Sequence, residues 1–343
     1  MMIMTGKVKN VFKNKKILVT GGAGSIGSEI VKQLLKKDVN VVRIFSNDEN
    51  AIFQMQQELQ GPNVRFLIGD VRDKERLRMA MKEIDVVYHA AALKHVPLCE
   101  YNPFEAIKTN VLGTQNIIDA ALEENVKKVI SISTDKAVNP VHTMGATKLL
   151  SERLMIDANF YKGRKKTVFS CVRFGNVSFS RGSVIPLFEK QIVNGGPVTL
   201  TDKNMTRFIM SISKAVELVF KATEMTKSGE VFIFKMPVIR LGDLADVMIK
   251  ELAPKHGYKP EKIKIKTIGP RPGEKLYEEL MTDAESRNAL ETKEMFILLP
   301  QVQIGGEIGK FMYPGAKKIQ SKTYNSKDVS PLSKSEIRKL LYE

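Results

Sequence analysis

An aspartate and a lysine stand side by side directly after a predicted β-strand. The strand covers Val129 to Ser133, and Thr134, Asp135 and Lys136 follow it. Ligands of open parallel sheets bind at the carboxyl ends of the strands, so the pattern predicts that this pair lies where chemistry takes place. A carboxyl group and an amine at that edge can serve as general acid and general base. An exposed ion pair at the start of a loop is the structural alternative.

A predicted helix opens shortly afterwards with Met144 to Lys148, and Lys148 lies one turn after Met144 on the same helix face. Methionine cannot exchange a proton, so the first proton acceptor of a reaction here is not evident. His142 is one possibility, although a histidine on a surface turn is the commoner explanation. A water relayed to Lys148 or to Asp135 is another. We predict Thr134, Asp135, Lys136, Met144 and Lys148 as the catalytic group.

A glycine loop follows the first predicted strand without a gap. Gly21, Gly24 and Gly27 allow a tight turn and a close approach of the backbone to a pyrophosphate, and a helix begins near Ser25. The amino terminus of that helix would face the phosphates. The order of strand, glycine loop and helix therefore predicts a dinucleotide site that includes Ser25 and Ile26.

The second predicted strand ends at Ser46 and Asn47, where NAD-specific proteins usually place a carboxylate. The absence of an acid there favours NADP, with NAD as the alternative, because no arginine occupies position 47 and Asp48 is close by. Asp70 and Val71 end the third strand. Asp70 could contact the adenine amine or cap the next helix.

Three alanines end the fourth predicted strand, where small side chains let the backbone approach a cofactor. They are Ala90, Ala91 and Ala92.

The elements that must position these residues alternate between short β-branched runs and amphipathic helices from Lys16 to about Asn176. This alternation predicts a Rossmann-like, doubly wound parallel sheet, which is an α/β fold, followed by a smaller C-terminal α/β substrate lobe. We predict a dinucleotide-binding domain over 12–177, with 208–236 returning to it, a substrate lobe over 178–207 and 237–320, and a tail or helix over 321–343. The predicted strands are Ile17 to Thr20, Val41 to Phe45, Val64 to Ile68, Val86 to His89, Val129 to Ser133 and Val168 to Arg173. Helices are predicted over Ser25 to Lys37 and Phe104 to Glu124, among others.

Composition limits the function classes. The chain has 343 residues and a formal net charge of +16, but its basic residues are dispersed, so we expect an anionic small substrate rather than nucleic acid. The two cysteines do not suggest a disulfide framework, and we expect no metal site. The longest apolar runs are far too short to span a membrane. The basic segment Met1 to Lys15 lacks the apolar run of a secretory signal, so we expect a cytoplasmic protein.

Several motifs resemble those of a known family. They are Gly21 to Gly27, Ala90 to Pro97, Thr109 to Thr114, Ser133 to Ala137, Arg173 to Asn176, Arg181 to Val184, Met205 to Phe208 and Arg271 to Lys275. Together the chain resembles the UDP-N-acetylglucosamine 4,6-dehydratases, the polysaccharide-biosynthesis branch of the extended short-chain dehydrogenases/reductases. Met144 departs from the usual tyrosine of that superfamily, although one branch of the family is similar in carrying methionine there. The resemblance implies a tightly bound, recycled cofactor, a cofactor contact from Asn110, and a homo-oligomer, either dimer or hexamer.

A UDP-N-acetylhexosamine substrate, also implied by the resemblance, needs cations that converge on its diphosphate. Arg181, Arg207 and Arg271 are the predicted cations, and a surface charge is the alternative for each. The other predicted substrate contacts are Lys94, Asn176, Val184 and Glu274, together with Phe188, Val198 and Thr199, which could flank the uracil or be core residues.

The implied reaction oxidises the sugar at C4, eliminates water across C5 and C6, and reduces C6. Lys136 would remove the C5 proton, with its proton affinity lowered by the oxidised nicotinamide, and Asp135 would protonate the departing 6-hydroxyl. A UDP-hexose 4-epimerase on the same fold is the nearest rival. A non-catalytic protein that binds a dinucleotide or nucleotide sugar is a further alternative, because Met144 removes a residue that most relatives use.

Overall fold

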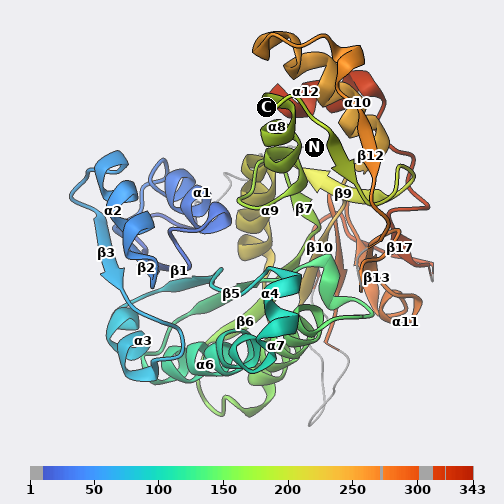
Figure 1. The fold of residues 1–343 in the computed structure, drawn as a ribbon. Helices are drawn as coiled ribbons and strands as arrows, with labels where there is room; N and C mark the ends of the chain where they lie inside the picture. The colour runs from blue at the N-terminus through green and yellow to red at the C-terminus, as the bar shows by residue number, and fades with distance from the viewer. Residues whose placement is uncertain (1–10, 271–272, 301–311, 321, 343) are drawn as a thin grey trace, which may run out of the picture.

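The computed structural model describes residues 11–270, 273–300, 312–320 and 322–342. A ten-stranded sheet in the order β16-β14-β15-β10-β6-β5-β4-β1-β2-β3 runs through the molecule (Figure 1). Its parallel strands are β1 (Lys16–Thr20), β2 (Val41–Ser46), β3 (Val64–Ile68), β4 (Val86–His89), β5 (Lys128–Ile132), β6 (Val168–Arg173) and β10 (Val231–Phe234). The order 3-2-1-4-5-6 is that of the Rossmann fold, so the predicted fold class is confirmed. The six predicted strands agree with β1 to β6 to within one residue at each end.

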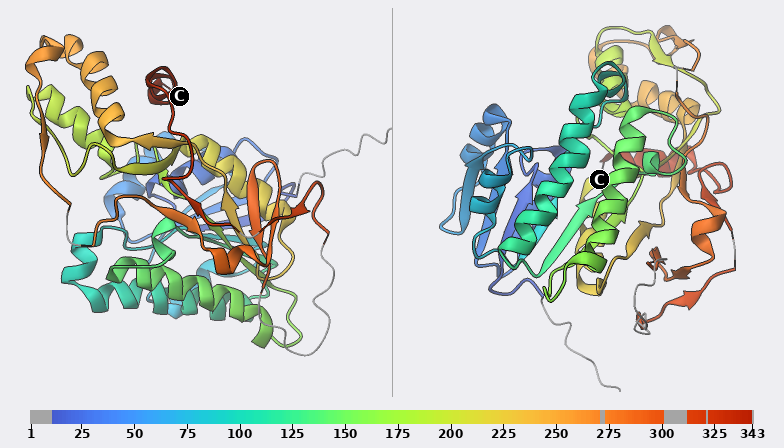
Figure 2. Two further views of the ribbon diagram at one scale, coloured as in Figure 1. Left: turned by 90° about the vertical axis from the view of Figure 1, so that its right-hand side faces the viewer. Right: turned by 90° about the horizontal axis from the view of Figure 1, so that it is seen from below.

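Helices cover both faces of this sheet. The face with α1 (Ser25–Leu34) and α9 (Ile212–Met225) also has α2 (Glu49–Glu58) beside it, and α3 (Lys74–Met81), α6 (Gly113–Glu123) and α7 (Thr143–Tyr161) cover the opposite face (Figures 1 and 2). Apolar side chains spaced at helical intervals explain this packing. In α1, Ile30 and Leu34 lie one turn apart and are fully buried.

The predicted helix over 104–124 is divided into three parts: α5 (Pro103–Ala106), the π-helical segment η1 (Ile107–Leu112) and α6. The wider turn brings Asn110 into the interior, where its side chain bonds to the backbone of Leu93 and to the Thr147 hydroxyl. Single π-helical turns of this kind are often found near functional sites. Here the segment connects the loop after β4 to the helix that carries Lys148.

A smaller lobe lies over the carboxyl edge of the sheet and has its own apolar core (Figure 1). It contains α8 (Val184–Val193), β8 (Val198–Leu200), α10 (Leu241–Leu252), η3 (Pro254–His256), η4 (Pro260–Lys262), β12 (Ile265–Thr267) and α12 (Lys334–Tyr342). Strands β8 and β12 are parallel. A three-stranded sheet of β7 (Asn176–Val177), β9 (Thr206–Met210) and β11 (Val238–Arg240) connects the lobe to the main domain.

The domain boundaries differ in part from those predicted. Residues 208–236 do supply α9 and β10 to the main domain. The main sheet, however, also takes β14 (Ala289–Glu291), β15 (Met295–Leu298) and β16 (Lys317–Lys318) from the segment assigned to the lobe. Strand β15 is fully buried and pairs antiparallel with β10, because an apolar strand is most stable between two neighbours. Helix α12, from the predicted tail, packs on α10 of the lobe.

Shorter elements complete the site region. They are α4 (Val96–Tyr101), η2 (Asp135–Ala137), β13 (Glu279–Met281), α11 (Asp283–Ser286) and β17 (Tyr324–Asn325), which pairs with β13. Within the described ranges, no helix combines the length and the apolar character needed to cross a membrane.

Candidate active site

A continuous cleft lies between the carboxyl edge of the sheet and the lobe. It consists of three adjoining cavities of about 350, 500 and 210 Å³ that share lining residues. Gly21 and Ala90 line both of the first two cavities, and Asn176 and Ser183 line both the second and the third. The central cavity is lined by Thr134, Lys136, Met144 and Lys148 among others. The cleft therefore connects the glycine loop, the reactive strand end and the lobe.

The glycine loop has the shape that a dinucleotide needs. Gly21 has a φ of +64°, and a Cβ at this position would lie 2.6 Å from the Ala91 nitrogen. Any larger residue would therefore close the space between the loop and the end of β4. The α1 helix begins at Ser25, so its free amide groups adjoin the same cavity. The following predicted cofactor residues line the first two cavities: Gly21, Gly24, Ser25, Ile26, Gly27, Ser46, Asn47, Asp70, Val71, Ala90, Ala91, Ala92 and Lys148.

Asn110 differs from this group. It is buried and does not line the cleft, and its amide is already bonded to Leu93 and Thr147. These bonds hold the loop after β4 against α7, and the contact of Asn110 with the cofactor stays a prediction.

Asp70 neither caps a helix nor has a free carboxylate. Asp73 caps α3 by accepting a hydrogen bond from the Arg76 nitrogen. Asp70 instead accepts hydrogen bonds from the Arg72 guanidinium and from Asn47. Burial alone would raise the pKa of Asp70, but the bonds from Arg72 and Asn47 hold it below its usual value. The capping alternative for Asp70 is thus wrong, because the neighbouring acid has the better position.

Asp135 and Lys136 are adjacent to the cleft but are not equivalent. The Lys136 ammonium lines the central cavity and donates to Asp135 Oδ1 at 3.0 Å. Asp135 is completely buried beneath it and does not line the cleft. The Thr134 hydroxyl, which lines the cavity, also donates to Asp135 Oδ1 at 2.8 Å. Asp135 therefore reaches the cleft through Thr134 and Lys136, and the exposed ion pair considered as an alternative is not what the structure contains.

A second carboxylate, which sequence reasoning missed, faces Lys136. Glu278 is buried just before β13, and its Oε1 lies 3.8 Å from Lys136 Nζ and 3.7 Å from Arg207 Nε. Burial alone would lower the pKa of Lys136, but attraction to Asp135 and Glu278 outweighs it and raises the pKa above its usual value. Burial raises the pKa of Glu278 despite the attraction of Lys136. In the sequence, the only feature that points to Glu278 is its position shortly after the Arg271 to Lys275 motif.

Helix α7 places the remaining reactive side chains. Lys148 Nζ donates to the Ile132 carbonyl at 2.7 Å, and burial lowers the pKa of Lys148. Met144 is buried and packs with Cys99 and Ala106 at the cleft wall. His142 Nδ1 accepts from the Gly145 nitrogen at 2.9 Å, so His142 is the N-cap of α7. Burial and the charge of Lys136 lower the pKa of His142.

The cavity at the lobe end contains most of the predicted nucleotide contacts. It is lined by Asn176, Val184, Phe188, Thr199, Arg207 and Glu274. Val198 is completely buried in the lobe core and does not line the cavity, because alternate residues of β8 face opposite sides. Arg271 lies outside the described residues.

Lys94 and Arg181 line the central cavity rather than the lobe end. Lys94 Nζ donates to the Arg181 carbonyl at 2.8 Å, and the Arg181 guanidinium donates to the Ala23 carbonyl of the glycine loop at 3.0 Å. Arg181 therefore extends toward the cofactor loop, whereas the sequence placed it at the substrate diphosphate.

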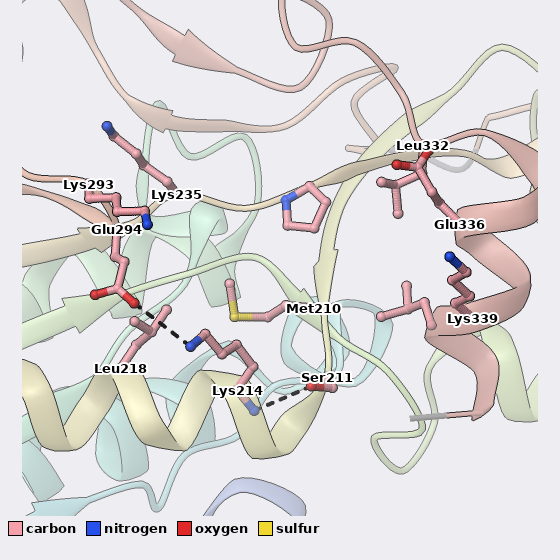
Figure 3. Close-up of a pocket in the computed structure, with 12 residues that line it drawn as sticks. Met210, Ser211, Lys214, Leu218, Lys235, Lys293, Glu294, Leu332, Glu336 and Lys339 are labelled. Atoms are coloured by element: carbon pink, nitrogen blue, oxygen red, sulfur yellow. Dashed lines mark hydrogen bonds and ion pairs between the residues drawn. The ribbon is translucent and has the colours of Figure 1, made fainter.

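Figure 3 shows a separate cavity of about 420 Å³ between α9 and α12. None of the predicted site residues lines it. Its four lysines are accompanied by Glu294 and Glu336, and Lys214 pairs with Glu294. The cleft along the sheet edge, which contains the buried ionisable groups, is therefore the better candidate for the active site.

Residues 17–300 match the family described as polysaccharide biosynthesis proteins. The chain is 58% identical to an uncharacterized membrane protein of Methanocaldococcus jannaschii, with 98% of each sequence covered. It is 42% identical to a UDP-N-acetylglucosamine 4,6-dehydratase (inverting) of Campylobacter jejuni, covering 95% of this chain and 96% of that protein. It is also 42% identical to a UDP-glucose 4-epimerase of Rickettsia bellii, with 96% of each covered. The structure of Pen from Bacillus thuringiensis matches with a TM-score of 0.90 and 46% identity, covering 97% of this chain and 98% of that chain.

Proposed function

The chain belongs to the polysaccharide biosynthesis protein family, and from that premise we propose that it is a nicotinamide-dependent UDP-N-acetylglucosamine 4,6-dehydratase. Its product would be a UDP-4-keto-6-deoxy sugar, formed with the release of one water. The observation that carries the proposal is the Asp135–Lys136 pair after β5, in which Lys136 lines the cleft and bonds to the buried Asp135. The dehydratase of Campylobacter jejuni supports it by its similarity over nearly the whole chain.

The glycine loop and the strand ends at Ser46, Asp70 and Ala90 would hold the dinucleotide, and NADP is preferred over NAD. When bound, the nicotinamide supplies the oxidation at C4 and the later reduction at C6. The C4 ketone acidifies the neighbouring C5 proton, and the remaining steps are proton transfers by side chains.

The elimination needs a neutral amine and a protonated carboxyl group at the same time. Neutral Lys136 beside an ionised Asp135, 3.0 Å away, reaches that state when Asp135 accepts the proton that the 4-hydroxyl loses on oxidation. Neutral Lys136 then removes the C5 proton, and Asp135 supplies a proton to the departing 6-hydroxyl. Because Asp135 is buried, the Thr134 hydroxyl, which donates to Asp135 and lines the cleft, would relay that proton.

The 4-hydroxyl must lose a proton when C4 is oxidised, and Met144 cannot accept it. His142 is poorly suited because its Nδ1 caps α7. Asp135 gives the simplest proton balance, because a proton taken from the 4-hydroxyl through Thr134 restores the acid that protonates the 6-hydroxyl. The water that leaves then contains the proton that the 4-hydroxyl lost.

A UDP-hexose 4-epimerase remains the second candidate, because the Rickettsia bellii relative is as similar to this chain as the dehydratase. An epimerase returns reducing equivalents to C4 and has no use for an eliminating acid and base. Mass spectrometry after incubation with UDP-N-acetylglucosamine separates the two, because only dehydration lowers the product mass by one water.

The decisive test combines this assay with NMR of the product formed in deuterated water. We expect a keto-deoxy sugar that carries solvent deuterium at C5. Asp135→Asn and Lys136→Ala should each lower turnover by at least about a hundredfold while the cofactor stays bound. The surface variant Lys165→Ala is the matched control. Undiminished turnover in either site variant would remove that residue from its role, and an isomer of unchanged mass would favour the epimerase.

A further inference from the structure

The loop between β7 and α8 reaches from the lobe onto the cofactor end of the cleft. The Arg181 nitrogen donates to the Ser25 hydroxyl at 3.1 Å, and the Arg181 carbonyl accepts from Lys94. Ser25 is the first residue of α1, directly after the glycine loop. These backbone contacts position Arg181 beside the space that the dinucleotide would occupy.

The Arg181 guanidinium extends along the outer edge of this site. One of its nitrogens donates to the Ala23 carbonyl at 3.0 Å, and another lies 3.8 Å from Asp48 Oδ2. Ala23 and Asp48 both line the cavity that also contains Ser46 and Asn47, at the end of β2. In this fold the end of the second strand adjoins the adenosine ribose. The guanidinium therefore lies at the ribose edge, and its side chain is 63% exposed, so it can still form bonds to a ligand.

Two other arginines of this part of the domain, Arg72 and Arg43, are held by protein groups. Arg72 donates to both oxygens of Asp70 and to Glu105. The Arg43 side chain turns away from this edge and donates to the carbonyls of Ala80 and Lys82 at the carboxyl end of α3. Arg181, by contrast, has a single hydrogen bond to a neutral carbonyl and a long contact with Asp48. Among these three, it is the guanidinium with the most capacity for a new anion.

We propose that Arg181 recognises the 2′-phosphate of NADP at the adenosine ribose. It would supply, from the substrate lobe, the cation that the sequence lacks directly after β2. This inference rests on the proposed function only in requiring a nicotinamide dinucleotide as the cofactor. The negative charge of Asp48 would repel the phosphate. Asp48 Oδ1 accepts the hydrogen bond that caps α2, and Oδ2 is the oxygen that faces the guanidinium and helps to hold it in place. Cofactor choice would thus depend on a residue far from the second strand in sequence.

The test measures binding of NADP⁺ and NAD⁺ to the purified full-length protein by isothermal titration, without substrate. Arg181→Gln should weaken NADP⁺ by about ten- to a hundredfold, the range expected for loss of charge-assisted hydrogen bonds. NAD⁺ affinity should change by less than about threefold. Asp48→Asn keeps the helix cap and removes the negative charge, so it should tighten NADP⁺. Arg164→Gln, an exposed arginine at a distant turn, is the matched control.

Equal weakening of NADP⁺ and NAD⁺ in Arg181→Gln would overturn the proposal, because the arginine would then act on a part common to both. Unchanged NADP⁺ affinity would also overturn it. If the dehydratase proposal fails, the keto sugar is not formed, but the affinities for the two dinucleotides are unaffected because they are measured without turnover. Asp135→Asn should lose product formation and keep its preference between the two cofactors.

Discussion

Lys136 lies between two buried carboxylates, with Asp135 at 3.0 Å and Glu278 at 3.8 Å. Both negative charges stabilise its ammonium form, whereas the proposed elimination needs the neutral amine. The charge on Glu278 therefore raises the pH at which Lys136 can act as a base. We regard Glu278 as a positioning residue, because it lies beside Lys136 and does not line the cleft.

Glu278→Gln should lower the pKa of Lys136, because it removes a nearby negative charge while keeping a side chain of similar volume. A base is active when deprotonated, so kcat/KM rises with pH through that pKa. The rising limb of the pH profile should therefore move to lower pH in the variant, a change that a purely structural role would not produce. Glu279→Gln, whose carboxylate bonds to Asn139, is the control. A rising limb at the same pH in both variants would contradict this role.

At the scale of elements, one buried arginine connects three segments behind the cleft. Arg173, at the end of β6, donates to Glu152 of α7 at 2.6 and 3.0 Å and to Glu285 of α11 at 2.9 and 3.1 Å. It also donates to the Leu280 carbonyl of β13. Glu285 in turn belongs to the capping box of α11 with Thr282. These bonds fix β13, and hence the segment that carries Glu278, against the helix that carries Lys148.

Arg173→Gln should lower the free energy of unfolding by about 3–5 kcal/mol, because it leaves buried carboxylates without their cation. Urea unfolding measures this, and Arg164→Gln should stay within about 0.5 kcal/mol of the parent. If Arg173→Gln lowers the free energy of unfolding as little as Arg164→Gln does, the Arg173 cluster does not hold these three segments together.

The pH dependence of the free energy of unfolding should also report on the cluster around Arg173. Burial alone would raise the pKa of Glu285, but Arg173 holds it below its usual value. The stabilisation is therefore complete above the ordinary carboxyl range and is lost as pH falls through the lowered pKa of the folded state. In Arg173→Gln the Glu285 carboxylate loses its cation and burial favours its protonated form, so the deficit relative to the parent should shrink toward acid pH. A deficit that grows on acidification would contradict the sign.

At the scale of the whole molecule, the cleft is formed by two packed units, each with its own apolar core. Arg207 and Glu274, at the lobe end, approach each other to 3.7 Å, and Arg207 is 3.7 Å from Glu278 below the central cavity. A nucleotide diphosphate in the lobe would therefore contact residues that also support the reactive lysine. Binding should stabilise the folded protein by an amount that grows with the logarithm of the ratio of ligand concentration to Kd.

UDP at a hundred times its Kd should add about 2.7 kcal/mol to the free energy of unfolding. For a chain of 343 residues this raises Tm by about 4 °C. Uridine at the same concentration should give a much smaller rise, because it brings no anion to the arginines. Differential scanning fluorimetry compares the two ligands. Equal shifts would mean that the diphosphate is not what the lobe recognises.

The sequence by itself determined the parts that depend on local pattern. Apolar periodicity predicted β1 to β6, and the strand-glycine-helix order predicted the loop at Gly21 to Gly27. The rule that strand ends share one edge brought Lys136 and the glycine loop to one cavity. Each of these inferences needs only a few neighbouring residues and the fold class.

Tertiary structure alone decided which side chains meet across that cavity. Glu278 faces Lys136 from the segment just before β13, the Arg181 side chain contacts the glycine loop, and Asn110 is used inside the protein. Asp135 is reached only through its neighbours, and residues 289–298 extend the main sheet. These arrangements depend on how distant segments pack to bury apolar surface and pair charges. Local spacing carries no information about such partners, because many sequences with the same periodicity can place them differently.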